Sequence, residues 1–200
     1  IRDRLRSRGL GDVYKRQGPE TWTHDHTKTG VHDLCGNIWE VLAGLRIKNG
    51  VLMVAANNDA ALPETDLTQC GDDWKLLTDD KGAPVYVSAS GSEIVFTTDN
   101  DEAGGVGSSE WGKVKTECKS EMLKEYALFA GEEEAYCYID ATEGEYIPVR
   151  GGNWDNGESA GVFNLNLVNP RSNSWAFGGG RSASVSYTHL RAHETGAYLV

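Results

Sequence analysis

The stretch from Tyr146 to Ala183, YIPVRGGNWDNGESAGVFNLNLVNPRSNSWAFGGGRSA, decides the fold and the function that we expect. It has few charged residues, is rich in Gly, Asn and Ser, and contains the large aromatic residues Trp154, Trp175 and Phe177. Small polar side chains offer adaptable hydrogen bonds and aromatic rings offer rigid contact area, a combination typical of binding surfaces. We therefore predict a ligand-binding surface here, and an upstream partner, Gly30–Glu40 (GVHDLCGNIWE), in the core beneath it.

The two ends of the chain differ in character from this stretch. Residues 7–17 (SRGLGDVYKRQ) and 185–195 (VSYTHLRAHET) back-translate to the same short DNA sequence in opposite orientations. That DNA resembles the adapter of a transposase-based sequencing library. A basic N-terminal arm for nucleic acid or a membrane surface is the alternative. We expect residues 1–17 and 185–200 to be adapter translations, and residues 18–184 to be one domain with its variable binding face at 150–183.

The charge balance of the middle of the chain argues against several partners. The whole chain has 19 Lys and Arg against 30 Asp and Glu, and the two ends hold seven of the basic and three of the acidic residues. The middle therefore carries a net charge of −15. Such a domain repels phosphate backbones, so we expect no nucleic-acid partner. No apolar run approaches the roughly 20 residues that cross a bilayer, so we expect no membrane insertion.

The four cysteines are far apart in the sequence, and no CxxC pair is present, which excludes a zinc ribbon. We expect free and mostly buried thiols, with two disulfides as the alternative; the cysteines are Cys35, Cys70, Cys118 and Cys137. The histidines at 24 and 26 are expected in a solvated loop, because metal ligation needs further convergent groups. The acidic segment Asp99–Glu102 lacks the full calcium-loop pattern and is also expected to be solvated.

Local patterns predict a sheet with few helices. Asp33–Leu42 is apolar around a Gly-Asn turn and should be buried. Ala43–Ala55 predicts a β-hairpin, because two strand-like runs flank Asn49-Gly50, the pair favoured in a type I′ turn. Between residues 56 and 112 we expect long loops with minor strands at Val85–Val87 and Glu93–Thr97.

The remaining elements complete an α+β domain that is rich in loops. Lys119–Ala130 has apolar residues at helical spacing, with Ser120 as a cap and Gly131 as a stop, so it predicts the clearest helix. Tyr136–Asp140 and Tyr146–Arg150 alternate as strands do.

Two motifs in this order resemble a known family. GVHDLCGNIWE upstream of IPVRGGNW (Ile147–Trp154), with a closing GGGRSA (Gly178–Ala183), is similar to the formylglycine-generating-enzyme branch of the C-type lectin fold. The resemblance implies that fold for nearly all of residues 18–184, although residues 56–145 match only loosely. The enzymes of this branch oxidise a substrate cysteine with a cysteine pair between the second motif and the closing one. Residues 151–181 contain no cysteine, and the histidines do not reproduce the motif of the iron-dependent relatives, so we expect no enzymatic activity.

The other branch of the family contains the variable proteins of diversity-generating retroelements. The sequence GVFNLNLVNPRSNS (Gly161–Ser174), following RGGNWDNG, resembles their C-terminal repeat, in which template-directed mutagenesis rewrites chosen codons. The resemblance implies a fixed scaffold with interspersed variable positions. The expected scaffold residues are Arg150, Gly151, Gly152, Trp154, Gly161, Val162, Phe163, Leu165, Leu167, Arg171 and Arg181. The expected outward, ligand-binding positions are Asn153, Asp155, Glu158, Ser159, Asn164, Asn166, Val168, Pro170, Ser174, Trp175, Ala176 and Phe177.

The family also implies the setting in which the chain works. Its members are phage tail receptor-binding proteins, often trimeric, and bacterial surface or cytosolic ligand-binding proteins. We expect a protein or glycan receptor on a bacterial surface, a location on the virion or the bacterial cell surface, and homo-oligomers. No cofactor is expected; a structural calcium ion, or a calcium-dependent lectin built on Asn153–Asn156, is the alternative. The second ligand motif of such lectins, Glu-Pro-Asn, is absent.

Overall fold

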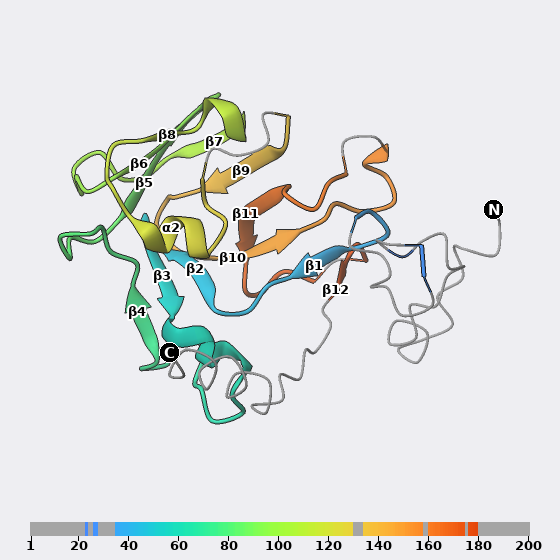
Figure 1. Ribbon diagram of the computed structural model, residues 1–200, viewed down its shortest axis with the longest axis horizontal. Coiled ribbons are helices and arrows are strands. Elements are labelled where there is room, and N and C mark those ends of the chain that lie inside the picture. The colour runs from blue at the N-terminus through green and yellow to red at the C-terminus, as the bar shows by residue number, and fades with distance from the viewer. Residues whose placement is uncertain are drawn as a thin grey trace, which may run out of the picture.

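The computed structural model describes residue 23 and residues 26–27, 35–129, 134–157, 160–174 and 176–179 (Figure 1). These residues are mostly β-structure, with a single short α-helix among them. The strands are β1 (Trp39–Val41), β2 (Leu45–Lys48), β3 (Val51–Ala55), β4 (Trp74–Leu76), β5 (Tyr86–Ser90), β6 (Glu93–Thr97), β7 (Val106–Glu110), β8 (Lys115–Thr116), β9 (Tyr136–Asp140), β10 (Glu145–Arg150), β11 (Leu165–Pro170) and β12 (Gly178–Gly179). The helices are α2 (Glu121–Glu125) and the 3₁₀ helices η3 (Ala56–Ala61) and η4 (Trp111–Lys113).

All the described strands belong to one curled sheet. Its main path runs β7-β9-β11-β10-β2-β3-β5-β6-β8, and β4 pairs with β3. The strands at the two ends of this order also come together. Isolated β-bridges join Ser88, in β5, to Gly104, and Gly91 to Gly107, in β7. The sheet therefore forms a half-barrel, which is visible on the left of Figure 1.

A second group of strands extends from the half-barrel. β1 pairs antiparallel with the end of β10, so that Glu40 lies opposite Arg150, and parallel with β12, so that Trp39 lies opposite Gly178. Figure 1 shows β1 and β12 side by side, away from β5 to β8. This extension brings the two sequence motifs into one place.

The β2–β3 hairpin is confirmed. Leu45 pairs with Val54 and Lys48 with Val51, leaving Asn49 and Gly50 as the two-residue turn. Both have positive φ, 51° and 79°, as a type I′ turn requires. The expected strands in residues 85–97, 136–140 and 146–150 are also present, as β5, β6, β9 and β10.

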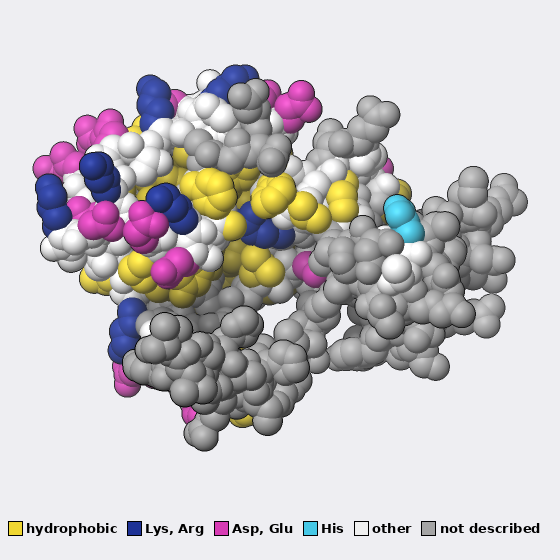
Figure 2. Space-filling model, in the orientation of Figure 1, with side chains coloured by type: hydrophobic (Ala, Val, Ile, Leu, Met, Phe, Trp, Pro, Cys, Tyr) yellow, Lys and Arg dark blue, Asp and Glu magenta, His cyan; other side chains and the backbone are white. Residues whose placement is uncertain are grey.

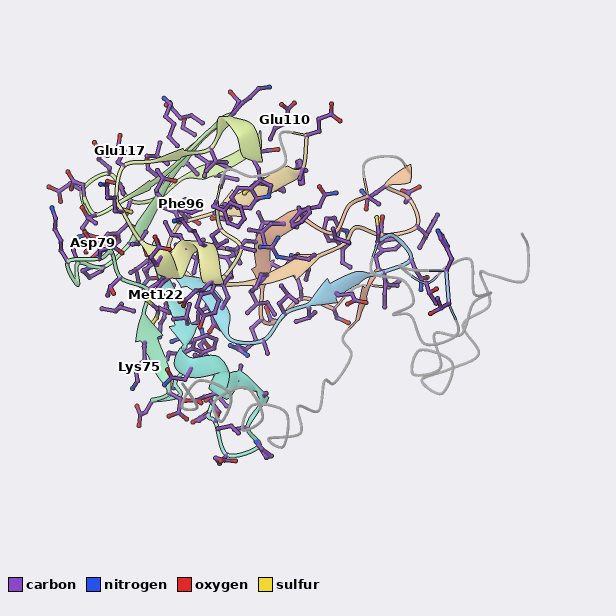
Figure 3. All side chains as sticks on the ribbon, in the orientation of Figure 1. Lys75, Asp79, Phe96, Glu110, Glu117 and Met122 are labelled. Carbon is purple, nitrogen blue, oxygen red and sulfur yellow. The ribbon has the colours of Figure 1, made fainter. Side chains whose placement is uncertain are left out.

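The core fills the inside of the curled sheet. Alternate residues of the strands point inward, as in β9 and β11, where Ile139 and Leu167 have no exposed surface. Figure 3 shows Phe96 inside this core and Glu110 at the periphery. Other fully buried core residues are Ile47, Leu52, Val54, Leu77, Val85, Val87, Ile94, Leu128 and Leu165.

The predicted helix is much shorter than expected. Ser120 is the cap, as predicted, and its Oγ accepts the Leu123 N–H at 3.4 Å. The helix ends after Glu125 because Ala127 adopts a φ of 53°, which an α-helix does not allow. This turn buries Leu128 and leaves Phe129 exposed. Ala130 and the expected stop, Gly131, lie outside the described residues.

The prediction that Asp33–Leu42 is buried is wrong for most of its described part. Trp39 is buried, but Val41 and Leu42 are exposed, because β1 is a short strand beside the end of β10 and contributes no residue to the core inside the curled sheet. The cysteines are all free, as expected, but Cys35 and Cys70 are exposed and only Cys137 is fully buried.

The described residues contain no cluster of His, Cys, Asp or Glu that could hold a metal ion. No helix in this part of the chain is long and apolar enough to cross a bilayer. The expected loop histidine at 24 and the closing Arg181 lie outside the described residues.

Candidate functional site

The two sequence motifs meet at a pair of backbone hydrogen bonds. The Gly36 N–H donates to the Gly151 carbonyl at 2.9 Å, and the Trp154 N–H donates to the Asn37 carbonyl at 3.0 Å. Gly36 and Asn37 both have positive φ, which turns the chain so that these groups face the loop after β10. The upstream motif thus supports the loop that carries Trp154.

The end of the expected binding stretch joins the same support. The Trp39 N–H donates to the Phe177 carbonyl at 2.7 Å. The rings of Trp154 and Phe177 lie 5.7 Å apart and are tilted by 54°, a favourable arrangement for two aromatic rings. Trp154 is 54% exposed and Phe177 37%. An exposed aromatic pair therefore stands on a framework of backbone hydrogen bonds.

Trp154 was expected in the scaffold, and that prediction is wrong. Its position in the loop after β10 turns its ring outward, whereas its backbone N–H faces the Asn37 carbonyl. Phe177 is exposed, as predicted.

The loop after β10 is shaped by its own amide side chains. The Asn153 N–H donates to Asn156 Oδ1 at 2.7 Å, and the Asp155 N–H donates to Asn153 Oδ1 at 3.2 Å. Gly152 has a φ of 81°, and a Cβ there would lie 2.9 Å from the Ala160 Cβ, so the loop closes only with glycine at this position. Asp155, the residue after Trp154, is exposed.

The segment before β11 is fixed by two side chains that donate hydrogen bonds to one of its backbone carbonyls. The Phe163 carbonyl accepts from Trp111 Nε1 at 2.9 Å and from Arg150 Nη1 at 3.2 Å. Its ring is 46% exposed, so the expected inward position of Phe163 is wrong, and Val162 is exposed as well. The alternation of inward residues begins only with β11, where Leu165 is fully buried.

Asn164 was expected to face outward, and this too is wrong. Only 4% of its surface is exposed, and its Oδ1 accepts the Tyr136 N–H at 2.8 Å. The amide thus satisfies a backbone donor at the start of β9, which explains why a polar residue is buried here.

The other expected variable positions fall into three groups. Exposed positions are Asp155, Ser174 and Ala176, together with Phe177. Half-buried positions are Asn153, Asn166, Val168 and Pro170. Glu158, Ser159 and Trp175 lie outside the described residues.

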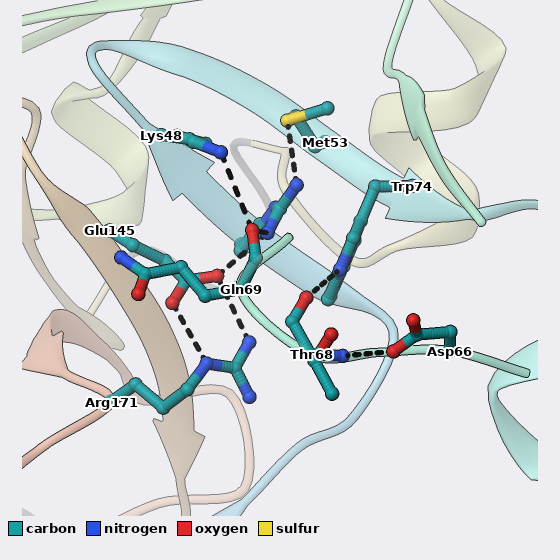
Figure 4. Close-up of polar contacts among 9 residues, drawn as sticks. Lys48, Met53, Asp66, Thr68, Gln69, Trp74, Glu145 and Arg171 are labelled. Atoms are coloured by element: carbon teal, nitrogen blue, oxygen red, sulfur yellow. Dashed lines mark hydrogen bonds and ion pairs between the residues drawn. The ribbon is translucent and has the colours of Figure 1, made fainter. Parts of the chain in front are cut away.

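A buried charge network was not predicted from the sequence. Glu145 Oε1 lies 2.7 Å from Arg46 Nη1, and Glu145 Oε2 lies 2.8 Å from Arg171 Nε (Figure 4). The Arg46 guanidinium also stacks 4.2 Å from the centre of the Trp74 ring. The hydrogen bonds from Arg171 and then Arg46 hold the pKa of Glu145 below its ordinary value, although burial opposes this. Arg171, which was expected in the scaffold, bonds the Glu145 carboxylate. The sequence signal for this network is Arg46, a charged residue between the apolar Leu45 and Ile47 of β2.

Three of the four thiols, those of Cys35, Cys118 and Cys137, are poorly suited to thiolate chemistry. Partial desolvation raises the pKa of Cys35 and of Cys118, and full burial raises that of Cys137 most strongly. A raised pKa leaves less thiolate at neutral pH. Cys35 precedes Gly36, whose N–H donates to the Gly151 carbonyl below the aromatic pair, and its thiol is one of these.

A separate hollow of about 310 Å³ lies between the hairpin, η3 and the end of α2. It is lined by Ala43, Gly44, Ala55, Ala60, Glu125 and Tyr126. The Tyr126 hydroxyl already donates to the Ala55 carbonyl at 2.7 Å, and its pKa is raised by burial. Apart from Tyr126, Glu125 is the only lining residue of this hollow with a titratable side chain.

The sequence was compared with models of known families and with curated proteins. No family model matches the chain. The search of curated proteins also finds no match.

Proposed function

We propose that this chain is a non-catalytic display domain that binds another macromolecule through the face carrying Trp154 and Phe177. The observation that carries the proposal is this exposed aromatic pair, with ring centres 5.7 Å apart. Large exposed aromatic side chains in a polar, glycine-rich setting are typical anchors of an interface. The backbone hydrogen bonds beneath them reduce the conformational entropy that binding would otherwise cost.

The proposed family is the variable proteins of diversity-generating retroelements, with the C-type lectin fold of the formylglycine-generating-enzyme subtype. The contact between the Gly36–Asn37 turn and the Gly151–Trp154 loop supports this proposal, because the two motifs that carry the resemblance meet there. The proposed setting is a phage tail or a bacterial cell surface. The proposed partner is a receptor on a bacterial surface, bound without a cofactor.

Two observations support a binding role over an oxidase role. Residues 151–181 contain no cysteine. Cys35, beside the turn that supports the face, has its pKa raised by partial desolvation, which disfavours a nucleophilic thiolate.

The first test is population sequencing of the gene. We expect substitutions to gather in the codons for Asp155, Ser174, Ala176 and Phe177, with an adenine-bearing template repeat and a reverse transcriptase gene nearby. The codons for Gly152, Leu165 and Arg171 should stay constant. An invariant face with no template repeat nearby would exclude diversification.

The second test measures binding directly, with the labelled chain and bacterial cells from the source community. We expect Trp154→Ala and Phe177→Ala each to weaken cell staining by about tenfold or more, as loss of an interface anchor does. Leu76→Ala is the matched control, because Leu76 is an equally exposed apolar residue on β4, outside the proposed face. Equal staining by all three variants would contradict the proposed face.

A further inference from the structure

Two Asn-Gly pairs occur in the sequence, Asn49-Gly50 and Asn156-Gly157. In such a pair the backbone nitrogen of the glycine can approach the amide carbon of the asparagine, because glycine has no side chain that hinders the approach. Attack of this nitrogen converts the amide to an acid, a slow reaction that contributes to the thermal lability of asparagine. The two pairs of this chain differ in how freely the nitrogen can move.

The Asn49-Gly50 pair is held on several sides. The Asn49 N–H donates to the Gly144 carbonyl at 2.9 Å, and Asn49 Oδ1 accepts the Gly144 N–H at 2.8 Å. Gly50 is buried, its carbonyl accepts the Val87 N–H at 2.9 Å, and a Cβ on it would lie 3.1 Å from the Ala103 Cβ. The peptide bond between the two residues therefore cannot turn without a loss of packing and of hydrogen bonds.

The Asn156-Gly157 pair is open. Gly157 is exposed, and apart from its chain neighbours no atom lies within 4 Å of the place where a Cβ would be. Within the described part of the chain, no group accepts the Gly157 N–H. A hydrogen bond from the Asn153 N–H to Asn156 Oδ1, at 2.7 Å, restrains the side chain but not the Gly157 nitrogen. This nitrogen can reach the amide carbon by local rotation.

We propose that Asn156-Gly157 is a site of spontaneous deamidation and that the isoaspartate it yields opens the loop that carries Trp154. The Gly157 nitrogen loses its proton and forms a bond to Asn156 Cγ, while the bond from Cγ to Nδ2 breaks and ammonia leaves with a proton. Water then opens the resulting cyclic imide at either of its two carbonyls. Opening at the former side-chain carbonyl gives aspartate. Opening at the backbone carbonyl gives isoaspartate, in which the main chain runs through the former side chain.

Isoaspartate disturbs the turn that supports Trp154. Asn156 is bonded to Asn153 in both directions, because its N–H also donates to the Asn153 carbonyl at 3.2 Å. In isoaspartate, Asn156 Oδ1 becomes a main-chain carbonyl oxygen, and the chain is longer by the Cβ atom, so both bonds cannot persist in this geometry. The Trp154 N–H lies within the turn and donates to the Asn37 carbonyl at 3.0 Å. A looser turn therefore frees the Trp154 ring from its fixed position.

Deamidation also changes the charge of the loop. Asp155 is the only charged residue of 151–157, so the reaction places a second negative charge directly beside the first. Figure 1 shows this loop on the right, away from β5 to β8. Among the coloured side chains of Figure 2, acidic and basic ones gather over β5 to β8, on the left. The added charge makes the product separable from the unaltered chain by ion exchange.

The reaction is tested on the full chain, incubated at mildly alkaline pH and at body temperature. Peptide mapping by mass spectrometry follows the conversion of amide to acid at each asparagine. We expect Asn156 to convert about tenfold faster than Asn49, which requires a barrier lower by about 1.4 kcal/mol. A parallel sample at mildly acidic pH should convert more slowly, since the Gly157 nitrogen must lose its proton. Conversion at Asn156 no faster than at Asn49 would overturn the proposal.

The effect on the loop is measured by hydrogen exchange of the purified isoaspartate form. We expect the amide protons of Asn153 and Trp154 to exchange about tenfold faster than in the unaltered chain, as loss of a hydrogen bond allows. Asn156→Asp is the matched control, because it adds the same charge but keeps a side-chain oxygen for the Asn153 N–H. Its exchange should stay slow. Slow exchange in the isoaspartate form, or equally fast exchange in Asn156→Asp, would contradict the proposed opening.

The consequence for binding rests on the proposed function. We expect cell staining by the isoaspartate form to fall about tenfold, as for loss of the Trp154 anchor. A protein isoaspartyl methyltransferase, which returns isoaspartate to aspartate, should restore it. Unchanged staining by the isoaspartate form would refute the link between deamidation and binding. If the unaltered chain stains no cells, the proposed function fails, and the mass spectrometry and hydrogen exchange still decide whether this site reacts and opens the loop.

Discussion

At the scale of single residues, the Glu145 carboxylate is the most consequential group outside the proposed face. It comes from β10, and its two guanidinium partners come from β2 and from the residue after β11, so it ties together three parts of the chain. Burying the charges of Glu145 and Arg46 is costly, and Arg46 Nε is left without a partner. Once the charges are buried, however, removing one of them leaves the others uncompensated.

We predict that Glu145→Gln strongly destabilises the protein. Two guanidinium groups would lose their counter-ion, one of them in a site where the side chain is only 2% exposed. Breaking such a pair costs about 3–5 kcal/mol of unfolding free energy. Urea unfolding at neutral pH measures this change. Glu93→Gln is the control, because the pair of Glu93 with Lys115 is exposed and its loss should be within error.

The same variant predicts a pH dependence. The folded pKa of Glu145 is lowered, so its stabilising contribution is complete above the ordinary carboxyl pKa of about 4.3 and is lost as the pH falls through the folded pKa. The difference in stability between the unaltered chain and Glu145→Gln should therefore be constant from neutral pH down to about pH 5 and shrink below that. If the stability difference stayed constant into strong acid, the charge of Glu145 would not be what stabilises the folded protein.

At the scale of elements, turn residues and the alternation of side chains predicted the strands whose structure depends on neighbouring residues in the sequence. The β2–β3 hairpin follows from Asn49-Gly50, and β9 from its alternation of residues. The helix at Glu121–Glu125 was overestimated because periodicity cannot show that Ala127 takes a left-handed conformation. Trp154 and Asn164 were misplaced for a related reason: both lie outside the strands, where alternation does not fix orientation, and their positions depend on distant partners, Asn37 and Tyr136.

The curled sheet closes through contacts between residues far apart in the sequence. At one of these contacts, between Gly105 and Ala89, we predict that glycine cannot be replaced. Gly105, just before β7, has a φ of 81°, and a Cβ there would lie 2.0 Å from the Ala89 carbonyl oxygen. Gly82 has a similar φ of 85°, with open space around the same position. Gly82→Ala should cost about 1–2 kcal/mol, because only the backbone is strained. Gly105→Ala should cost a further 1–3 kcal/mol or prevent folding, because the Ala89 backbone must move.

Thermal or urea unfolding of the two variants checks this comparison, since the difference between them isolates the steric contribution. Loss of the hydrogen bond from the Ala141 N–H to the Gly105 carbonyl, followed by hydrogen exchange, would report opening of the sheet at β7. Equal stability of Gly82→Ala and Gly105→Ala would mean that β7 does not close the half-barrel in solution.

At the scale of the whole molecule, the first and the last described strands pair with each other. β12 pairs with β1, so the last strand of the sheet lies beside the first one. The aromatic pair sits at this junction, because the Trp39 N–H, in β1, donates to the Phe177 carbonyl just before β12. The proposed binding face is thus built where the first and the last described strands meet, and its geometry depends on both.

This closure predicts the behaviour of a shortened chain. The described strands and core all lie between residues 18 and 184, so removing residues 1–17 and 185–200 should leave the melting temperature unchanged. The net charge becomes more negative, from −11 to −15, and salt near 0.15 M screens the added repulsion over about 8 Å. Calorimetry of the two proteins in the same buffer measures the effect. A drop of more than about 4 °C, equivalent to about 1 kcal/mol or more, would show that the end segments contribute to the fold and are not adapter translations without a structural role.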